Sequence, residues 1–406
     1  MALRDCHNSF DFEAAAKRRL PKPLFDYIDG GADDERTKRS NVAAFDRYSF
    51  APNYLRDVRR VDMRCTVLGC DLDWPLILSP TGMSRMFHAD GEHGAARAAA
   101  SVGAGYALST MASTSIEAIA AATDAPKIYQ LYLLADDALN FAAIDRAKAA
   151  GYNAICLTVD TVVAGNRERD LRSGLTIPPR FGIGSLLAFA ARPGWVIDYV
   201  RGGRFSMPNI APPGSAATDI STLSAFFAEK MERHIGWDRV ERLIAYWGGP
   251  FAIKGLQTAA DALIAAKSGA TAVIVSNHGG RQLDGAAPAI DLIADIVDAA
   301  GDRIDVILDG GIRRGAHIVT ALAMGARAVM TGRPYVYALA AYGQPGVTRL
   351  LGLLRQETER TLALLGCASI DELGRQHLRL TDQLPAFMTA PPLDDPATPY
   401  PHWNRR

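Results

Sequence analysis

"TAVIVSNHGGRQLDG" (residues 271–285) runs from an apolar, β-branched segment directly into a turn that holds a histidine, an arginine, an aspartate and three glycines. A short apolar run without polar alternation is typical of a strand that is buried on both faces of a parallel sheet. The glycines that follow His278 allow a sharp turn, which would direct Arg281 back toward the end of the strand. The stretch therefore predicts a buried parallel strand with polar, chemically useful side chains at its carboxyl end.

The same pattern recurs along the chain from residue 75 onward. Each apolar run is followed by a polar or glycine-containing segment and then by a helical stretch, and four of these helices (92–102, 136–150, 259–268 and 316–324) end at a glycine. Eight alternating units predict an α/β fold, the closed (β/α)8 or TIM barrel. The eight runs are "PLILSP" (75–80), "YALST" (106–110), "KIYQLY" (127–132), "AICLTVD" (154–160), "FAIKG" (251–255), "AVIVSNH" (272–278), "DVILDGG" (305–311) and "AVMTGR" (328–333).

Residues 1–70 precede the first of these units. An alanine-rich helix is predicted to stop near Pro21, and a second short helix is predicted to end at Gly30 and Gly31. We therefore expect an N-terminal helical cap on a single barrel domain that spans residues 1–406.

The connection between the fourth and fifth strands is longer than the others. Residues 178–221 are rich in proline and glycine and are predicted as an insertion after the fourth strand. The part at 180–205 combines aromatic and aliphatic side chains with four arginines and a single acid, Asp198. This mixture fits a surface that lies on a membrane with anionic head groups, and the alternative is a lid over the barrel mouth or a subunit contact.

The composition excludes several classes of protein. The chain has 44 basic and 44 acidic residues, so it carries no overall attraction for nucleic acid. Its five cysteines are scattered without a CxxC pair, and its eight histidines are dispersed, so we expect reduced thiols and no metal site. The N-terminus "MALRDCHNSF" lacks the apolar core of an export signal, and no run of 18 apolar residues predicts a spanning helix.

Polar side chains follow the predicted strands at their carboxyl ends, which meet at one mouth of a barrel. Asp160 ends the fourth strand and His278 ends the sixth. A carboxylate that orients an imidazole makes it a better proton acceptor. The two residues are therefore candidates for a catalytic base and its partner, although a lone histidine is more often structural.

Two arginines are candidates for binding an acid. Arg281 follows His278, and Arg167 lies in "GNRERD" after the fourth strand. Two guanidinium groups suit bidentate capture of a substrate carboxylate. The alternative for Arg167 is a surface pair with Glu168 or Asp170.

Lys254 ends a strand that is expected to be buried, where its amine must meet an anion or become neutral. It could form a Schiff base or stabilise negative charge on a cofactor. The glycines and arginines of "ILDGGIRRG" and "VMTGRP", at the seventh and eighth strands, predict a phosphate site at the usual position in a barrel. Neither a GxxxxGK[ST] loop nor a GxGxxG fingerprint supports a nucleoside triphosphate or a nicotinamide cofactor.

With these motifs together, the sequence resembles the FMN-dependent 2-hydroxy-acid oxidase and dehydrogenase family over nearly its whole length. "SNHGGRQLDG" is the most specific of the motifs. The others, in the order of the family, are "LPKPLFDYIDGGADDE", "SPTGM", "QLY", "LTVD", "RERD", "IKG", "LDGGIRRG" and "TGRP".

The resemblance implies a role for each matching residue. His278 would be the base, Asp160 would stabilise its protonated form, and Lys254 would place positive charge beside the flavin ring. The substrate would be held by Tyr27, Tyr132, Arg167, His278 and Arg281. The residues expected to contact FMN are Pro80, Thr81, Gly82, Ser109, Gln130, Thr158, Lys254, Ser276, Asp309, Gly311, Arg313, Gly332 and Arg333.

Three positions favour one branch of the family. Gly82 stands where oxidases usually have alanine, as in the quinone-linked members that oxidise (S)-mandelate or L-lactate. Met111 and Ala164 stand where glycolate oxidases have bulkier tryptophan and leucine, which predicts a wider pocket. The stretch "PGWVIDYVRGG" (193–203) resembles the membrane-anchoring insertion of mandelate dehydrogenases.

The prediction is thus an enzyme that oxidises an (S)-2-hydroxy acid, mandelate-like or lactate, and passes electrons to a quinone or another acceptor. We expect a homotetramer at the cytoplasmic side of the inner membrane. The alternatives are a soluble oxidase that forms hydrogen peroxide, and a barrel of another class that binds a phosphorylated ligand without redox chemistry.

Overall fold

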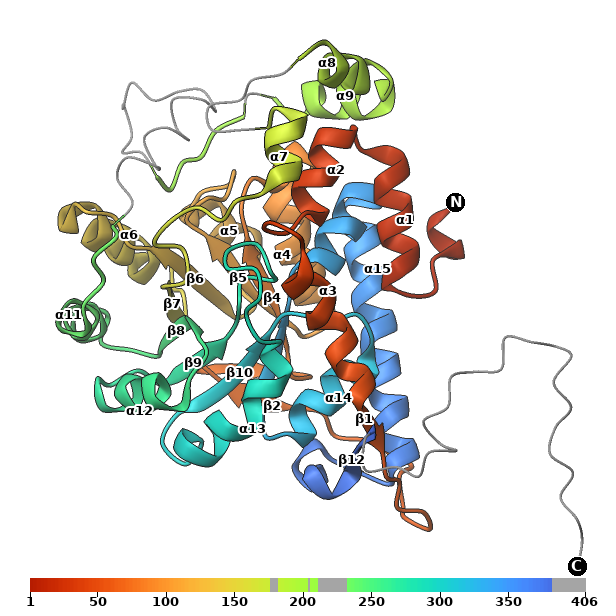
Figure 1. The fold of residues 1–406 in the computed structure, drawn as a ribbon, viewed down its shortest axis with the longest axis vertical. Coiled ribbons are helices and arrows are strands. Elements are labelled where there is room, and N and C mark those ends of the chain that lie inside the picture. The colour runs from red at the N-terminus through yellow and green to blue at the C-terminus, as the bar shows by residue number, and fades with distance from the viewer. Residues whose placement is uncertain (176–181, 204, 211–231, 382–406) are drawn as a thin grey trace, which may run out of the picture.

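The computed structural model describes residues 1–175, 182–203, 205–210 and 232–381 (Figure 1). These residues form a closed barrel of eight parallel strands with helices around it, so the predicted TIM barrel is confirmed. The barrel closes where β11 pairs with β4. In chain order its strands are β4 (Leu76–Thr81), β5 (Gly105–Ser109), β6 (Lys127–Tyr132), β7 (Ala154–Thr158), β8 (Phe251–Leu256), β9 (Ala272–Val275), β10 (Asp305–Asp309) and β11 (Ala328–Thr331).

The strands are buried on both faces, which explains why their sequences are apolar throughout. Every residue of β5, β7, β9 and β11 is buried. One set of alternate residues, Ile77, Ala107 and Ile128 among them, packs together with the hairpin β2 (Cys65–Val67) and β3 (Cys70–Leu72). The hairpin therefore plugs the amino-terminal end of the barrel, below the strands in Figure 1.

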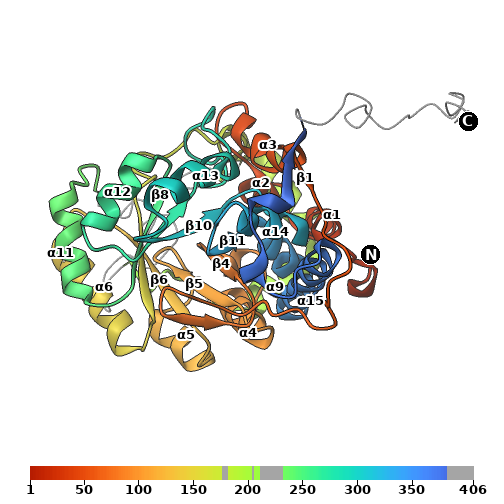
Figure 2. The same ribbon diagram turned by 90° about the horizontal axis from the view of Figure 1, so that it is seen from below.

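Helices form an outer ring around the strands (Figure 2). The four helices predicted from glycine-terminated patterns are confirmed to within one residue at each end. Asp136 and Thr258 begin two of them, because their side chains accept hydrogen bonds from Ala138 and Asp261 backbone N–H groups. The ring consists of α4 (Gly91–Ser101), α5 (Ile116–Ala122), α6 (Asp137–Ala149), α11 (Trp237–Trp247), α12 (Ala259–Lys267), α13 (Ala289–Ala300), α14 (Gly315–Ala323) and α15 (Arg333–Leu365), which is broken at Gly343.

The N-terminal segment forms α1 (Ser9–Arg19), α2 (Lys22–Asp29) and α3 (Arg36–Ala43). The Asn8 side chain caps α1, and Pro21 separates α1 from α2 as predicted. Helix α1 packs against α15 and α2 packs against α7 (Glu168–Ser173). Strand β1 (Tyr48–Phe50) then pairs with β12 (Leu378–Leu380), so this segment runs along the barrel from its mouth to its other end (Figure 1).

The long connection between β7 and β8 holds α7, α8 (Ile183–Ala190) and α9 (Pro193–Arg201) before α11 begins. Part of the predicted insertion, at 178–181, 204 and 211–221, lies outside the described residues, and so do Arg180 and Arg204. Helices α8 and α9 lie above the mouth end of the molecule in Figure 1.

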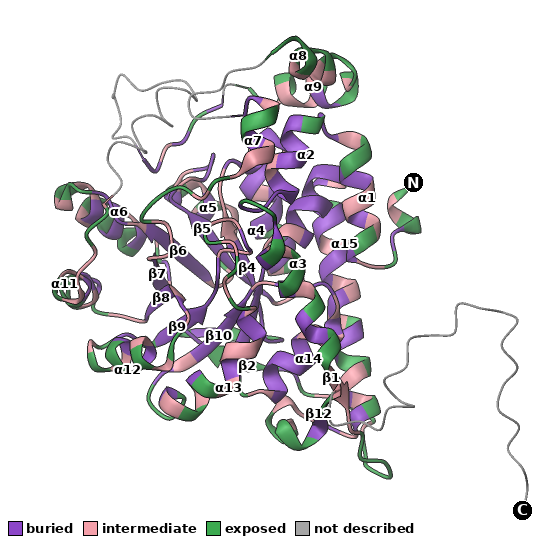
Figure 3. Cartoon of the chain, in the orientation of Figure 1, coloured by how far each residue is buried: buried purple, intermediate pink, exposed green. Residues whose placement is uncertain are grey.

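Polar contacts hold α9 to the segment after β4 and to α1. The Trp195 indole N–H donates to the Met86 carbonyl at 2.9 Å. The Arg19 guanidinium pairs with Asp198 at 2.9 Å. On α8 and α9 several large apolar side chains stay exposed (Figure 3): Ile183, Leu186, Leu187, Ile197 and Val200.

No helix in the described ranges combines the length and apolar character that crossing a bilayer requires. All five cysteines are buried free thiols.

Candidate active site

The imidazole of His278 pairs with a carboxylate at the barrel mouth. Its Nδ1 lies 2.9 Å from Asp160 Oδ1, so the strand ends of β7 and β9 come together as the sequence suggested. A carboxylate can only accept here, so Nδ1 carries the proton and Nε2 remains to accept another. Glycine is required at position 255, because a Cβ there would lie 2.7 Å from Asp160 Cβ.

The backbone of His278 is strained. Its φ is 56°, in the left-handed region that residues with side chains rarely adopt. The His278 N–H donates to Ser276 Oγ at 3.0 Å, and the two glycines that follow also have positive φ, 65° and 73°. The turn that the glycines allow thus begins at the histidine itself, and it aims the ring toward Asp160.

Asp160 is held in its charged form. Burial would raise its pKa, but the facing His278 and the ammonium of Lys254 lower the pKa below its ordinary value. Its Oδ2 is buried and has no hydrogen-bond partner among the described residues. Its negative charge therefore lies directly against the Nδ1–H of His278.

Two guanidinium groups lie against the ring of Tyr27. Arg281 is 4.9 Å and Arg167 is 5.4 Å from the ring centroid. Burial, and then the charge of Arg167, lower the pKa of Arg281 to about 10. A bound carboxylate would relieve this unfavourable pair of like charges, so the arrangement suits an anion.

The alternative proposed for Arg167 is partly correct. Its Nε lies 3.3 Å from Asp170 Oδ2, but Asp170 is buried and Glu168 pairs with Arg172 instead. Arg167 therefore faces both Asp170 and the ring of Tyr27.

Lys254 belongs to a buried polar chain across the barrel. Its Nζ lies 2.7 Å from Asp309 Oδ2 and donates to Ser276 Oγ at 2.9 Å. Ser79 donates to the other oxygen of Asp309 at 2.7 Å. Burial would lower the pKa of Lys254, but Asp309 and Asp160 raise it, so the amine stays charged and does not fit a Schiff base.

The buried hydroxyl of Tyr132 is influenced by both groups of charges. Burial raises the pKa of its hydroxyl, Asp160 raises it further, and Lys254 and Arg167 lower it. The charges of Asp160, Lys254 and Arg167 therefore all act on this one phenol, and so does the neighbouring Tyr27. The predicted catalytic and substrate-binding residues therefore gather at one place.

Three further predicted residues form a polar edge on β5, β6 and β7. Ser109 Oγ donates to Gln130 Oε1 at 2.9 Å. Gln130 Nε2 and Thr158 Oγ1 are buried, and neither has a hydrogen-bond partner among the described residues. Such orphaned groups are costly unless a ligand satisfies them.

Two arginines and two glycines of the predicted phosphate site come together at the ends of β10 and β11. Burial lowers the pKa of Arg333, and the nearby charge of Arg313 lowers it further. Gly311 follows β10 with φ 79°, a conformation that favours glycine. The Arg333 guanidinium donates to backbone carbonyls of Gly279 at 2.7 Å and Gly30 at 2.8 Å, and Gly332 precedes it as the N-cap of α15.

The residues that follow β4 are in tight contact with those that follow β5. Pro80 and Thr81 lie at an irregularity in the β4–β5 register. A Cβ on Gly82 would lie 2.7 Å from Met111 Cβ and 2.9 Å from the Met111 carbonyl oxygen. Position 82 thus tolerates only glycine unless the Met111 backbone moves.

Three residues that support the site were not singled out from the sequence. Tyr335, at the start of α15, donates to the Ser79 carbonyl at 2.9 Å and bonds to Thr81. Asn41 and Asn277 exchange two amide hydrogen bonds of 2.8 Å, which tie α3 to the turn of His278. The available signal was that Tyr335 directly follows "TGRP" and that Asn277 lies within "SNHGG", whereas Asn41 lies in neither motif.

Comparisons with known proteins all indicate the same family. A family model described as FMN-dependent dehydrogenase matches residues 16–380. An L-lactate dehydrogenase from Caulobacter sp. (strain K31) is 40% identical over 374 residues, 92% of this chain and 98% of the relative. Glycolate oxidase from Spinacia oleracea is 39% identical over 371 residues, 91% of this chain and 95% of the relative. A solved structure of the monotopic membrane protein (S)-mandelate dehydrogenase has a TM-score of 0.89 at 36% identity, covering 93% of this chain and 100% of that one. The chain therefore belongs to the FMN-dependent dehydrogenase family and is an FMN-dependent enzyme that oxidises 2-hydroxy acids.

Proposed function

We propose that this enzyme oxidises a large (S)-2-hydroxy acid of the mandelate type to the 2-oxo acid and passes the electrons to a quinone or a similar acceptor. The observation that carries the chemistry is the His278–Asp160 pair beside the two guanidinium groups of Arg281 and Arg167. Family membership sets aside the alternative of a barrel without redox chemistry.

The residues of the mouth fit FMN. The unpartnered Gln130 Nε2 and Thr158 Oγ1 would hold the polar edge of the ring system, together with Lys254, Ser109 and Ser276. Bound FMN supplies a two-electron acceptor. The other residues that we assign to the cofactor are Pro80, Thr81 and Gly82 along the ring, and Asp309, Gly311, Arg313, Gly332 and Arg333 along the ribityl chain and phosphate.

The arrangement of these side chains supports a role for each of them in the reaction. Arg281 and Arg167 would hold the substrate carboxylate, with Tyr27 beneath both. Tyr132 would contact the substrate hydroxyl, and His278 Nε2 would take a proton from the substrate. Asp160 stabilises the imidazolium that forms, because its charge is fixed 2.9 Å away.

The proposed substrate size rests on two small or adaptable side chains. Met111 is unbranched and flexible, and we infer from the family resemblance that Ala164, which is exposed in this structure, would leave space where a larger residue would narrow the pocket. The similarity to a mandelate dehydrogenase structure supports an aromatic substrate. Lactate is the second candidate, supported by the L-lactate dehydrogenase relative.

The proposed acceptor rests on Gly82. The absence of a Cβ at this position is shared with the quinone-linked branch, and the close approach of Met111 depends on it. The relatives also include glycolate oxidases, so an oxidase that forms peroxide is the competing function.

Turnover with different acceptors will distinguish these functions. We expect (S)-mandelate to be oxidised faster with an artificial dye or a soluble quinone than with oxygen, and glycolate to be a poorer substrate than mandelate or lactate. The measurement is initial rate with each acid, by dye reduction and by oxygen uptake in parallel. Peroxide formation at a rate equal to dye reduction would support the oxidase instead.

We further propose that α8 and α9 bind a membrane surface. Ile183, Leu186 and Leu187 are exposed by 80%, 57% and 65%, and they lie on one short apolar helix. Exposed apolar clusters of this kind indicate an interaction surface. The homotetramer and the cytoplasmic side of the membrane stay predictions from the family resemblance.

Vesicle binding will test this surface. The double variant Leu186→Glu, Leu187→Glu should reduce binding to vesicles of phosphatidylglycerol and phosphatidylethanolamine by at least about tenfold, because it removes two apolar side chains from the contact. Co-flotation with the vesicles measures the bound fraction. Leu364→Glu, on an equally exposed side chain of α15, is the control. Undiminished flotation of the double variant would contradict the proposed surface.

A further inference from the structure

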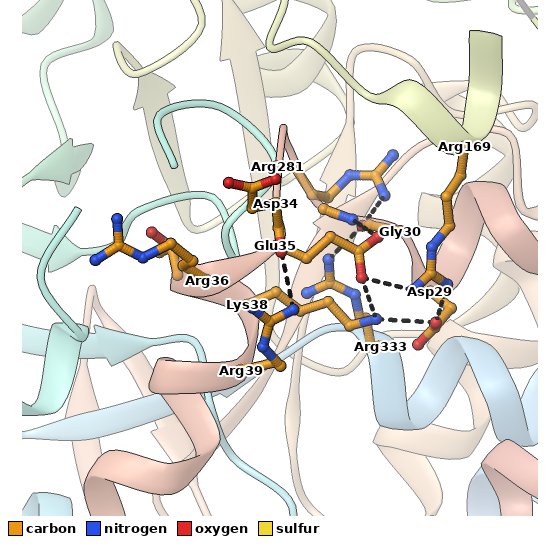
Figure 4. A network of polar contacts seen from close by, with 12 residues as sticks. Asp29, Gly30, Asp34, Glu35, Arg36, Lys38, Arg39, Arg169, Arg281 and Arg333 are labelled. Atoms are coloured by element: carbon orange, nitrogen blue, oxygen red, sulfur yellow. Dashed lines mark hydrogen bonds and ion pairs between the residues drawn. The ribbon is translucent and has the colours of Figure 1, made fainter. Parts of the chain in front are cut away.

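Four charged side chains join the N-terminal segment to α7 (Figure 4). Arg169 reaches Asp29 at 2.6 Å through Nη1 and Glu35 at 2.5 Å through Nη2. Lys38 contacts the same two carboxylates, at 2.9 Å and 3.3 Å. We refer to Asp29, Glu35, Lys38 and Arg169 as the ionic quartet.

Opposite charges balance within the ionic quartet. Two acids face two bases, and the two carboxylate side chains are only 12% and 11% exposed. Burial would raise the pKa of Asp29, but Lys38, Tyr337 and Arg169 lower it to about 2. Arg169 is the member that comes from another part of the chain, so it connects the N-terminal segment to the β7–β8 connection.

The backbone between the two acids contacts the active site. The Gly31 N–H donates to Glu35 at 3.0 Å, which fixes this backbone from the side of the quartet. On its other side the Gly30 carbonyl accepts from Arg281 Nη1 at 3.1 Å and from Arg333 Nη2 at 2.8 Å. One carbonyl oxygen therefore contacts two arginines at once (Figure 4), each of which also donates to other backbone carbonyls nearby.

We propose that Arg169 is a positioning residue for both arginines. Arg169 forms ion pairs with Asp29 and Glu35 and so fixes the position of the Gly30 carbonyl. That carbonyl in turn orients Arg281 toward the substrate carboxylate and Arg333 toward the FMN phosphate. The proposal rests on the roles assigned to these two arginines above. It predicts that one substitution outside the pocket weakens recognition of two separate anions together.

A structural role alone predicts a different result. If Arg169 only stabilised the fold, its substitution would lower the melting temperature. It would not weaken the binding of FMN more than the binding of a flavin without the phosphate. Two comparisons distinguish a positioning role from a purely structural one. The first is the change in KM relative to the change in kcat for the 2-hydroxy acid. The second is the affinity for FMN relative to the affinity for riboflavin, which lacks the phosphate.

Variants of Arg169 in the full-length protein test the proposal. We expect Arg169→Gln to raise KM for (S)-mandelate about tenfold with little change in kcat, and to weaken FMN binding about tenfold, because the loss of one well-placed hydrogen bond to a charged group costs about this much. Riboflavin affinity should not change. Arg169→Lys keeps the charge but loses the fork, and we expect an intermediate effect. Arg172→Gln is the matched control, since Arg172 lies on the same helix and pairs only with Glu168 among the ion pairs described.

Each outcome decides the proposal. An unchanged KM and an unchanged FMN-to-riboflavin ratio, even with a lower melting temperature, would overturn it. If Arg169→Gln does not fold, the same two comparisons in Arg169→Lys give the decision. If the unmodified enzyme oxidises none of the acids tested, the proposed function fails, whereas the flavin ratio still tests the effect of Arg169 on Arg333.

Discussion

Replacing His278 by glutamine will leave FMN bound but will reduce kcat/KM for the 2-hydroxy acid by about a thousandfold, the usual contribution of a general base. Glutamine can occupy the space of the imidazole and can donate to Asp160, but it cannot accept a proton. The Nδ1–Asp160 contact of 2.9 Å leaves Nε2 as the only nitrogen available to do so. Steady-state rates with a dye acceptor, and the flavin absorbance of the purified variant, measure the two parts of this prediction.

The control for this substitution is another histidine. His234 is exposed and distant in sequence from the strand ends, so His234→Gln should retain the rates of the unmodified enzyme. A His278→Gln variant with rates close to those of this control would exclude His278 as the base.

Arg281→Lys should raise KM for the substrate by about tenfold to a hundredfold, the cost of losing charged hydrogen bonds, with a smaller effect on kcat. The Arg281 guanidinium donates to the carbonyls of Tyr27 at 2.6 Å and Gly30 at 3.1 Å while it lies over the Tyr27 ring. Lysine keeps the positive charge, but it has neither the planar fork nor the flat face that these contacts require. Substrate-concentration dependence of turnover, with (S)-mandelate and lactate, is the measurement.

Arg327→Lys is a suitable control, because Arg327 bonds to the Thr66 carbonyl in the hairpin at the opposite end of the barrel. The KM of the Arg327→Lys variant for (S)-mandelate and lactate should not change. If Arg281→Lys has the same KM as this control, Arg281 does not hold the substrate carboxylate.

The barrel could be predicted because buried parallel strands leave a strong signal. Their apolar runs and the glycines that end the helices locate each unit to within a few residues. The hairpin β2–β3 was missed since each of its strands has three residues, too few for a periodic pattern. The break of α15 at Gly343 was also missed, because a bend depends on what the helix packs against.

The site was only partly accessible from the sequence. Strand ends place His278 and Asp160 at one mouth, so their pairing could be anticipated. The link from Lys254 to Asp309 could not, because β8 and β10 are separated by β9, so their contact depends on how side chains pack across the barrel mouth. The ionic quartet was also hidden: its acids lie in the charged stretch "DGGADDERTK" (29–38), which looks like an ordinary solvated turn until Arg169 is placed against it.

The most direct test of the whole account is a single-turnover experiment without oxygen. (S)-Mandelate is mixed with the FMN-bound enzyme, and bleaching of the oxidised flavin is followed for the unmodified protein and for His278→Gln. We predict rapid bleaching by (S)-mandelate in the first and bleaching slowed by about a thousandfold in the second. Equal rates in the two proteins, or no bleaching of the unmodified enzyme by (S)-mandelate or L-lactate, would contradict the account.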